Sequence, residues 1–170
     1  MTLFIDGFES PIGSVHVVSD GRALCALDFG APEARLLPLL HARFDPAVAL
    51  RDADDPLGLV SRTRAFFAGE LAALDGAAVD GGGTPFQRRV WEALRQIPAG
   101  TTVTYGAVAA LLGVPRASRA VGAAIGRNPV SIAVPCHRVI GAGGSLTGYA
   151  GGLERKRWLL AHERAARSLV

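Results

Sequence analysis

Cysteine and lysine are scarce in this sequence of 170 residues. The two cysteines, Cys25 and Cys136, are too few for a disulfide-stabilised scaffold or for a zinc module with four cysteine ligands. The four histidines show no ligand spacing with them, so we predict no metal site. Lys156 is the only lysine. At 49% hydrophobic and 19% charged residues, the chain can form one domain or two small ones with a core.

The sequence also lacks a targeting segment and a membrane span. Its first residues reach Asp6 without the basic segment and apolar stretch of a signal peptide. The longest uncharged run, residues 96–115, has the length of a bilayer span but contains two prolines and three glycines, so we expect a turn and a helix there. We therefore predict a cytoplasmic protein that does not contact membranes, in which Cys136 stays a free thiol.

Acidic residues are rare in the second half of the chain. Residues 1–80 contain six bases against twelve acids, a net charge of −6, whereas residues 81–170 contain twelve bases against three acids, a net charge of +9. This asymmetry suggests that the second half binds a polyanion. A general preference for arginine would produce the same excess, so charge alone leaves both explanations open.

Residues 1–80 are predicted to form an N-terminal α/β support domain. Two short apolar runs on either side of Asp20-Gly21 predict a hairpin. Apolar residues at helical spacing, and Asp55 followed by Pro56 as a helix start, predict two helices. The expected elements are strands over 12–18 and 23–29 and helices over 33–44 and 56–69. A linker rich in glycine and alanine is expected over 77–83, where the charge changes sign.

Residues 81–170 are predicted to form a mostly helical C-terminal domain. Thr84 and Gln87 form a capping box with proline at the first helical position, and Thr104 is a second helix cap. The expected elements are helices over 84–97, 105–112, 116–126 and 152–167 and a short strand over 130–134. Together the two halves predict an α+β protein.

Two of these helices, 105–112 and 116–126, have the layout of a helix-turn-helix with Gly113 in the turn. Many helical corners contain such a glycine and bind nothing, but the surrounding positive charge favours DNA. Apart from Arg116, Ser118 and Arg119, the second helix offers mainly alanine and glycine, which cannot read base edges. We therefore expect binding that tolerates any sequence, in the minor groove, with Arg119 as a wedge.

Cys136 is the candidate nucleophile. A thiol reacts once it is deprotonated, and His137 is a candidate base while Arg138 adds positive charge nearby. Adjacent residues of a strand point to opposite faces, so His137 can serve Cys136 only where the chain turns. A buried structural cysteine beside an ordinary histidine is the alternative. The glycine-rich residues 141–152 lack the features of a phosphate cradle and predict a mobile loop that borders a pocket.

The ordered motifs between residues 84 and 165 resemble those of the O6-alkylguanine-DNA alkyltransferase family. The most specific is Pro-Cys-His-Arg-Val at 135–139. The others are Phe86-Gln87, Val90-Trp91, Tyr105, Arg119–Gly122, Asn128-Pro129, Gly148-Tyr149 and Leu159–Glu163. The resemblance implies a domain with a small antiparallel sheet followed by a helical domain with a helix-turn-helix. In this chain residues 81–170 would be that C-terminal domain for DNA binding and alkyl transfer.

The same resemblance implies an activity and its residues. Cys136 would take the alkyl group from O6-alkylguanine, or from O4-alkylthymine, and keep it as a thioether, once per molecule and without a cofactor. His137 would pass a proton through water, Glu163 would orient His137, and Asn128 would hold the turn and the thiol. The implied partner is double-stranded DNA with alkylated bases, bound in the minor groove by a monomer. Implied contacts to substrate or DNA come from Tyr105, Arg119, Gly122, Ala123, Arg138, Val139, Tyr149 and Ala150.

Two other functions are compatible with parts of the sequence. A non-catalytic alkyltransferase-like protein would bind the lesion and recruit other factors, but such relatives lack the cysteine. A Cys-His-Glu hydrolase would use Cys136, His137 and Glu163 but leaves the paired helices and the basic half unexplained. The sequence also departs from the family in places: Ala150 stands where some relatives have a serine hydroxyl, and Cys25 alone cannot form the zinc site found in others.

Overall fold

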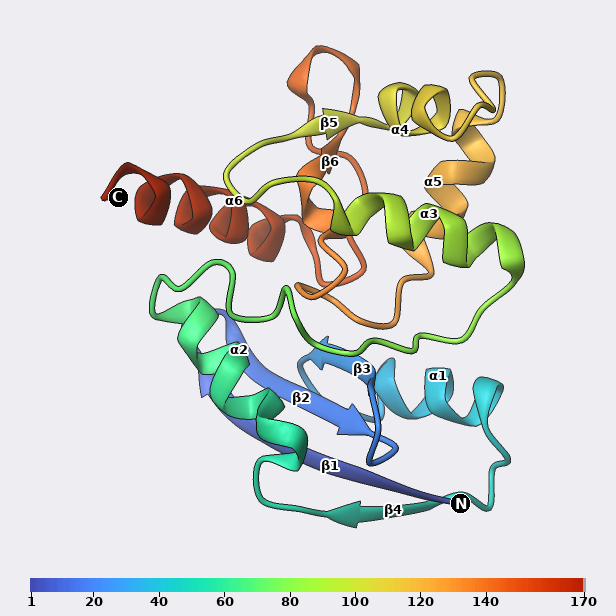
Figure 1. Ribbon diagram of the computed structural model, residues 1–170, viewed down its shortest axis with the longest axis vertical. Helices are drawn as coiled ribbons and strands as arrows, with labels where there is room; N and C mark the ends of the chain where they lie inside the picture. Colours follow the sequence, from blue (N-terminus) through green and yellow to red (C-terminus); the bar gives the residue numbers. More distant parts are fainter. Residues whose placement is uncertain (170) are drawn as a thin grey trace. The chain divides into compact units, whose positions relative to one another are not determined.

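The computed structural model describes residues 1–169, which form helices, two small sheets and the loops between them (Figure 1). The contacts divide the chain into two compact units, one of residues 1–82 with 129–133 and one of residues 83–128 with those from 134 on. The α+β class predicted from the sequence is confirmed. Within the described residues, no helix is both long and apolar enough to cross a membrane.

The first unit is built on a four-stranded sheet in the order β3-β2-β1-β4. β1 (Thr2–Ser10), β2 (Gly13–Ser19) and β3 (Leu24–Phe29) are antiparallel neighbours, and β4 (Ala49–Asp52) pairs parallel with β1. The predicted hairpin of β2 and β3 is therefore confirmed, whereas β1 and β4 were not predicted. The small antiparallel sheet expected in this part of the chain is confirmed, with β4 as an additional parallel edge strand.

Two helices cover the two faces of this sheet. Leu3 of β1 belongs to an apolar cluster with α1 (Leu36–Arg43). Because side chains alternate along a strand, Phe8 of β1 points to the other face, where its ring meets the edge of Phe67 in α2 (Leu59–Phe67) at 6.0 Å. β3 and β4 are the two edge strands; every residue of β3 is buried because its outer edge is covered by bridges to Val79 and Val130, whereas β4 is exposed.

Asp55 caps α2 across an intervening turn. The sequence predicts Asp55 as the cap of a helix that starts at Pro56, but a 3₁₀ turn occupies Pro56–Gly58 and α2 starts at Leu59. The Asp55 carboxylate still accepts the backbone N–H groups of Val60 at 2.8 Å and Ser61 at 3.1 Å. The capping residue is therefore as predicted and the helix start is three residues later.

Residues 129–133 pack with the first unit instead of forming the predicted strand. Only Val130 pairs, in a single bridge to Leu27 of β3, and a turn follows. Ile132 in this turn has φ of 68°, a left-handed conformation that β-branched residues rarely adopt. The prediction of a strand over 130–134 is therefore wrong, because a reversal of the chain interrupts the apolar run.

Up to residue 169, the second unit contains four α-helices, two 3₁₀ helices (Cys136–Arg138 and Ala142–Gly144) and a two-stranded parallel ladder. Its helices are α3 (Pro85–Arg95), α4 (Tyr105–Leu111), α5 (Ser118–Gly126) and α6 (Leu153–Ser168). The ladder pairs β5 (Val103–Thr104) with β6 (Val139–Ile140). The predicted caps are confirmed, because Thr84 and Gln87 form the capping box of α3 and the Thr104 hydroxyl accepts the N–H of Ala107 at 3.1 Å.

α4 and α5 pack against each other across a turn that contains Gly113. Gly113 has φ of 75°, which only glycine adopts at little cost, and the next residues form a further turn before α5 starts at Ser118. Val108 of α4 and Val121 of α5 are buried at this corner. The indole Nε1 of Trp91 in α3 donates to the Ala124 carbonyl at 2.8 Å and fixes α5 from the other side.

Candidate active site

Cys136 begins a short 3₁₀ helix, Cys136–Arg138, that leads directly into β6. Its thiol is buried, and the residue is 6% exposed. Asn128, just beyond the end of α5, donates from its amide Nδ2 to the Val134 carbonyl at 2.9 Å and to Cys136 Sγ at 3.2 Å. A single amide group therefore holds both the sulfur and the backbone that precedes it. The turn required for His137 to serve Cys136 is present.

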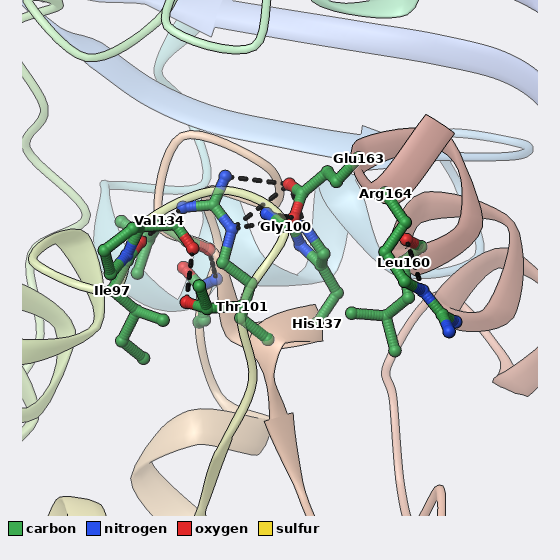
Figure 2. Close-up of polar contacts among 11 residues, drawn as sticks. Ile97, Gly100, Thr101, Val134, His137, Leu160, Glu163 and Arg164 are labelled. Carbon is green, nitrogen blue, oxygen red and sulfur yellow. Dashed lines mark hydrogen bonds and ion pairs between the residues drawn. The ribbon is translucent and has the colours of Figure 1, made fainter. Parts of the chain in front are cut away.

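His137 and Glu163 form a fully buried pair. α6 brings the Glu163 carboxylate to His137, and the distance from His137 Nε2 to Glu163 Oε1 is 2.7 Å (Figure 2). Burial would raise the pKa of Glu163, but hydrogen bonds from His137 and Arg138 outweigh it and lower the pKa to about 2. Burial lowers the pKa of His137, and Glu163 offsets only part of this effect. At neutral pH the pair is therefore a neutral imidazole and a carboxylate.

This charge state fixes the tautomer of His137. A carboxylate only accepts hydrogen bonds, so the imidazole must carry its proton on Nε2 and donate it to Glu163. Nδ1 then has a free lone pair, and it is buried without a hydrogen-bond partner among the described protein atoms. The pair therefore presents a basic nitrogen whose orientation is held from behind by Glu163.

Arg138 lies inside the unit and does not reach the surface. Its Nε donates to both Glu163 oxygens at 3.1 and 3.0 Å, its Nη2 to Glu163 Oε1 at 2.7 Å, and its Nη1 to the Ile97 carbonyl at 2.7 Å. The backbone N–H of Gly100 donates to Glu163 Oε2 at 3.0 Å (Figure 2). The sequence places Arg138 among the residues that contact DNA, but the structure commits its guanidinium to Glu163.

A cavity of about 120 Å³ opens beside Cys136. The predicted residues that line it are Tyr105, Gly122, Cys136, Tyr149 and Ala150. Of the other lining residues, Gly148 belongs to the glycine-rich loop that was expected to border a pocket, whereas Ile125 and Gly126 were missed by sequence reasoning. Ile125 and Gly126 lie in an apolar helical stretch of the sequence, which gave no chemical signal. The structure thus brings together segments from α4, α5, the 3₁₀ helix and the loop before α6.

Small residues keep this cavity open on the side of α5. A side chain at Gly122 would begin 3.7 Å from the ring of Tyr105, so any larger residue would fill the space in front of that ring. The Tyr105 hydroxyl donates to the Thr147 carbonyl at 3.0 Å and so connects α4 to the loop that follows β6. The cavity therefore has an apolar side formed by α5 and a backbone side formed by the loop.

Three other predicted residues lie outside the cavity lining. Arg119 and Ala123 are exposed on α5, as is Arg116 just before it. Val139 is buried in β6, and its carbonyl accepts a hydrogen bond from Lys156 Nζ at 2.7 Å. Sequence reasoning noted Lys156 as the only lysine but gave it no role.

Proteins of one family match this chain over nearly its full length. Residues 85–165 match the family model "6-O-methylguanine DNA methyltransferase, DNA binding domain". Methylated-DNA–protein-cysteine methyltransferase from Salmonella typhimurium is 48% identical over 165 residues, which cover 96% of each chain. The protein of the same name from Mycobacterium bovis is 44% identical over 159 residues, 92% of this chain and 90% of its own.

Solved structures agree with this result. The crystal structure of Mycobacterium tuberculosis OGT in complex with DNA is 39% identical, with a TM-score of 0.79 over 96% of this chain and 94% of its own. O6-methylguanine-DNA methyltransferase from Pyrococcus kodakaraensis is 27% identical, with a TM-score of 0.68 over 95% of this chain and 99% of its own. The chain described here therefore belongs to the methylated-DNA–protein-cysteine methyltransferase family.

Proposed function

We propose that this protein repairs double-stranded DNA by moving the alkyl group of O6-alkylguanine, and of O4-alkylthymine, irreversibly onto Cys136. The observation that carries the proposal is the buried Cys136 thiol at a small cavity, next to a His137–Glu163 pair whose free nitrogen is basic. Family membership supports DNA as the partner. We propose further that a monomer binds the minor groove through the unit that starts at residue 83.

The reaction needs one bond to form and one to break. The Cys136 sulfur attacks the alkyl carbon, a sulfur–carbon bond forms, and the bond between that carbon and O6 of guanine breaks. The thiol proton passes through a water to Nδ1 of His137 and returns to the departing guanine, so charge and protons balance. Glu163 stabilises the imidazolium that forms in between. The thioether product contains no bond that water cleaves readily, so each molecule acts once.

Asn128 supports the nucleophile in this scheme. Its amide N–H points at Cys136 Sγ from 3.2 Å, and an N–H donor stabilises a thiolate more than a thiol. The second N–H of the same amide binds the Val134 carbonyl, which fixes the direction of the first. Asn128 therefore both positions the sulfur and favours its reactive form.

The position of the cavity beside Cys136 and its lining support the binding of an extruded base. The target carbon is inaccessible inside a stacked duplex, so the nucleotide must rotate out of the helix, at a cost of a few kcal/mol. Tyr105 would contact the flipped base, Gly122 leaves room for it, and backbone groups of Cys136, Val139 and Ala150 would bind its edge. Ala150 has no hydroxyl, so only its backbone N–H is available to O6.

Helix α5 would contact the duplex. Arg119 is exposed near its start and would fill the space that the flipped base leaves. Ala123, one turn further along the same helix, is also exposed and small, which allows close approach to the sugar–phosphate backbone without reading sequence. These contacts support binding that depends on shape and damage.

Intact mass spectrometry after incubation with duplex DNA containing O6-methylguanine tests the proposal. We expect the wild-type protein to gain the mass of one methyl group, at Cys136. Cys25→Ala is the matched control, since Cys25 is also a buried free cysteine, and this variant should be methylated like the wild type. Cys136→Ala should stay unmodified while still binding DNA. An unmodified wild-type Cys136 would refute the proposal, and repair by Cys136→Ala would favour a non-catalytic lesion-binding protein.

A further inference from the structure

The only lysine of the chain is fully buried beside the candidate active site. Lys156 lies in the first turn of α6 and is 0% exposed. Its Nζ donates to three backbone carbonyls, those of Val139 at 2.7 Å, Thr147 at 3.1 Å and Gly148 at 3.3 Å. An ammonium group has three N–H donors, so the acceptors match its full capacity.

Such an arrangement costs free energy and requires an explanation. Burial lowers the pKa of Lys156, because removing an ammonium group from water disfavours its charged form, whereas a negatively charged Cys136 raises it. Carbonyl oxygens, and not a carboxylate, accept all three of its hydrogen bonds. A neutral residue of similar length would avoid the desolvation cost. A lysine at this position is therefore explained by the three hydrogen bonds that its ammonium group makes.

The three carbonyls belong to two segments that form the site. Val139 follows the Cys136–Arg138 helix directly, in β6. Thr147 also accepts the Tyr105 hydroxyl, and Gly148 lines the cavity beside Tyr149 and Ala150. The ammonium group of Lys156 therefore links β6, which follows Cys136–Arg138, to the loop that lines the cavity at Gly148.

Hydrogen bonds from distant and neighbouring residues hold this loop: besides Lys156, the Tyr105 hydroxyl donates to the Thr147 carbonyl and Arg155 donates to the Gly151 carbonyl at 3.0 Å. Residues 145–151 contain no helix or strand, and Gly148 has φ of 51°. The hydrogen bonds of regular secondary structure therefore do not fix the position of this loop. α6 begins just after the loop, and Lys156 extends from its first turn back to Thr147 and Gly148. The ammonium group is thus suited to set the distance between the loop and Cys136.

We propose that Lys156 is a positioning residue that holds the 147–150 wall of the base pocket against the Cys136 turn, so that the alkylated base is aligned for transfer. This inference rests on the proposed function. Arginine is a poor substitute, because its planar guanidinium directs its donors in a fixed fork that does not match three converging carbonyls. Methionine retains the apolar stem and removes all three donors.

The test compares Lys156→Met with Arg157→Met, the same change at the next, exposed position of α6. We expect Lys156→Met to slow methyl transfer from saturating duplex DNA by about 100-fold, the effect of misplacing reacting groups by about 1 Å. Affinity for the duplex, and the rate at which iodoacetamide alkylates Cys136, should stay at wild-type values. Lys156→Gln, whose amide donates two hydrogens, should fall between Met and wild type, and Arg157→Met should match the wild type.

Three results would overturn the inference. Wild-type transfer by folded Lys156→Met would show that the tie is dispensable, and a parallel loss of iodoacetamide reactivity would show that Lys156 acts on the thiol instead. Full activity of Lys156→Arg would show that charge alone suffices. Circular dichroism checks that each variant is folded. If Lys156→Met is unfolded, the transfer rates of Lys156→Gln, Lys156→Arg and the wild type are compared instead. Absence of transfer by the wild type would instead refute the proposed function.

Discussion

At the scale of single residues, Glu163 determines the charge state of the site. It accepts hydrogen bonds from His137, Arg138 and the backbone of Gly100, so its carboxylate is fully committed while it stays ionised. Arg138 neutralises the buried charge, and His137 is left as a neutral base. The three side chains act as one unit, in which loss of the carboxylate leaves the Arg138 charge without its partner.

This unit predicts how stability depends on pH. The pKa of Glu163 falls from 4.5 to about 2 on folding. A lowered carboxyl pKa stabilises the fold above the unfolded value, and this contribution, roughly 3 kcal/mol, is lost as pH falls from about 4.5 to about 2. Urea unfolding at a series of pH values should show this loss in the wild type and a flatter profile in Glu163→Gln.

Glu154→Gln is the control for this experiment, because Glu154 is an exposed glutamate in the first turn of the same helix. It should unfold like the wild type at every pH. Glu163→Gln should also be less stable at neutral pH, by about 3–5 kcal/mol, since a buried Arg138 loses its counter-charge. Equal pH profiles for Glu163→Gln and the wild type would contradict the assigned pKa.

The sequence predicts the site residues unevenly. Cys136 and His137 are adjacent, so the chemistry of a thiol beside a base is visible locally. Glu163 lies 26 positions from His137, and nothing in its own surroundings marks it, so only the resemblance to a family pointed to it. The burial of Arg138 could not be predicted from its neighbours in the sequence, because it depends on the Glu163 carboxylate, which folding brings from α6.

At the scale of elements, signals contained in a few residues predicted structure well. The Thr84 and Thr104 caps are local hydrogen-bonding patterns, and both helices start where these patterns place them. β1 was missed although its main partner β2 follows it directly, whereas β4 was missed because it is stabilised by parallel pairing with β1, a segment far away along the chain. Pairing between distant segments leaves no signal within either segment.

Helix α5 makes a prediction that separates base extrusion from plain binding. Arg119→Ala should slow methyl transfer from duplex DNA by about tenfold to 100-fold, because unstacking a base costs a few kcal/mol and the wedge would offset part of it. Transfer from a single-stranded oligonucleotide should stay at the wild-type rate, since nothing has to be extruded there. Stopped-time assays with both substrates, followed by mass spectrometry, measure the two rates.

Arg116→Ala provides the comparison, since Arg116 is exposed at the turn before α5 and has the same charge. It should weaken duplex binding slightly and leave the ratio of duplex to single-strand rates unchanged. An Arg119→Ala variant that is equally slow on both substrates would assign Arg119 to the chemistry or the pocket, and the wedge role would be wrong.

At the scale of the whole molecule, the mild net charge of +3 conceals two opposite halves. Residues 81–170 have a net charge of +9 and contain the candidate site, α5 and the exposed arginines around it. Residues 1–80 have a net charge of −6, and their sheet and two helices form a core of their own. Attraction to phosphates is thus confined to one part of the chain, which favours a single mode of contact with DNA.

Salt dependence of duplex binding tests this division of charge. If about four phosphates are neutralised, affinity should fall by about 100-fold between about 50 and 200 mM salt, because each contact releases condensed counterions. Arg127→Ala, at an exposed arginine just after α5, should reduce the slope of log affinity against log salt by about one. Asp54→Asn, at an exposed acid of the first half, should leave the slope unchanged. Fluorescence anisotropy with a labelled duplex gives all three slopes. A slope that responds to Asp54→Asn as strongly as to Arg127→Ala would mean that both halves approach the phosphates.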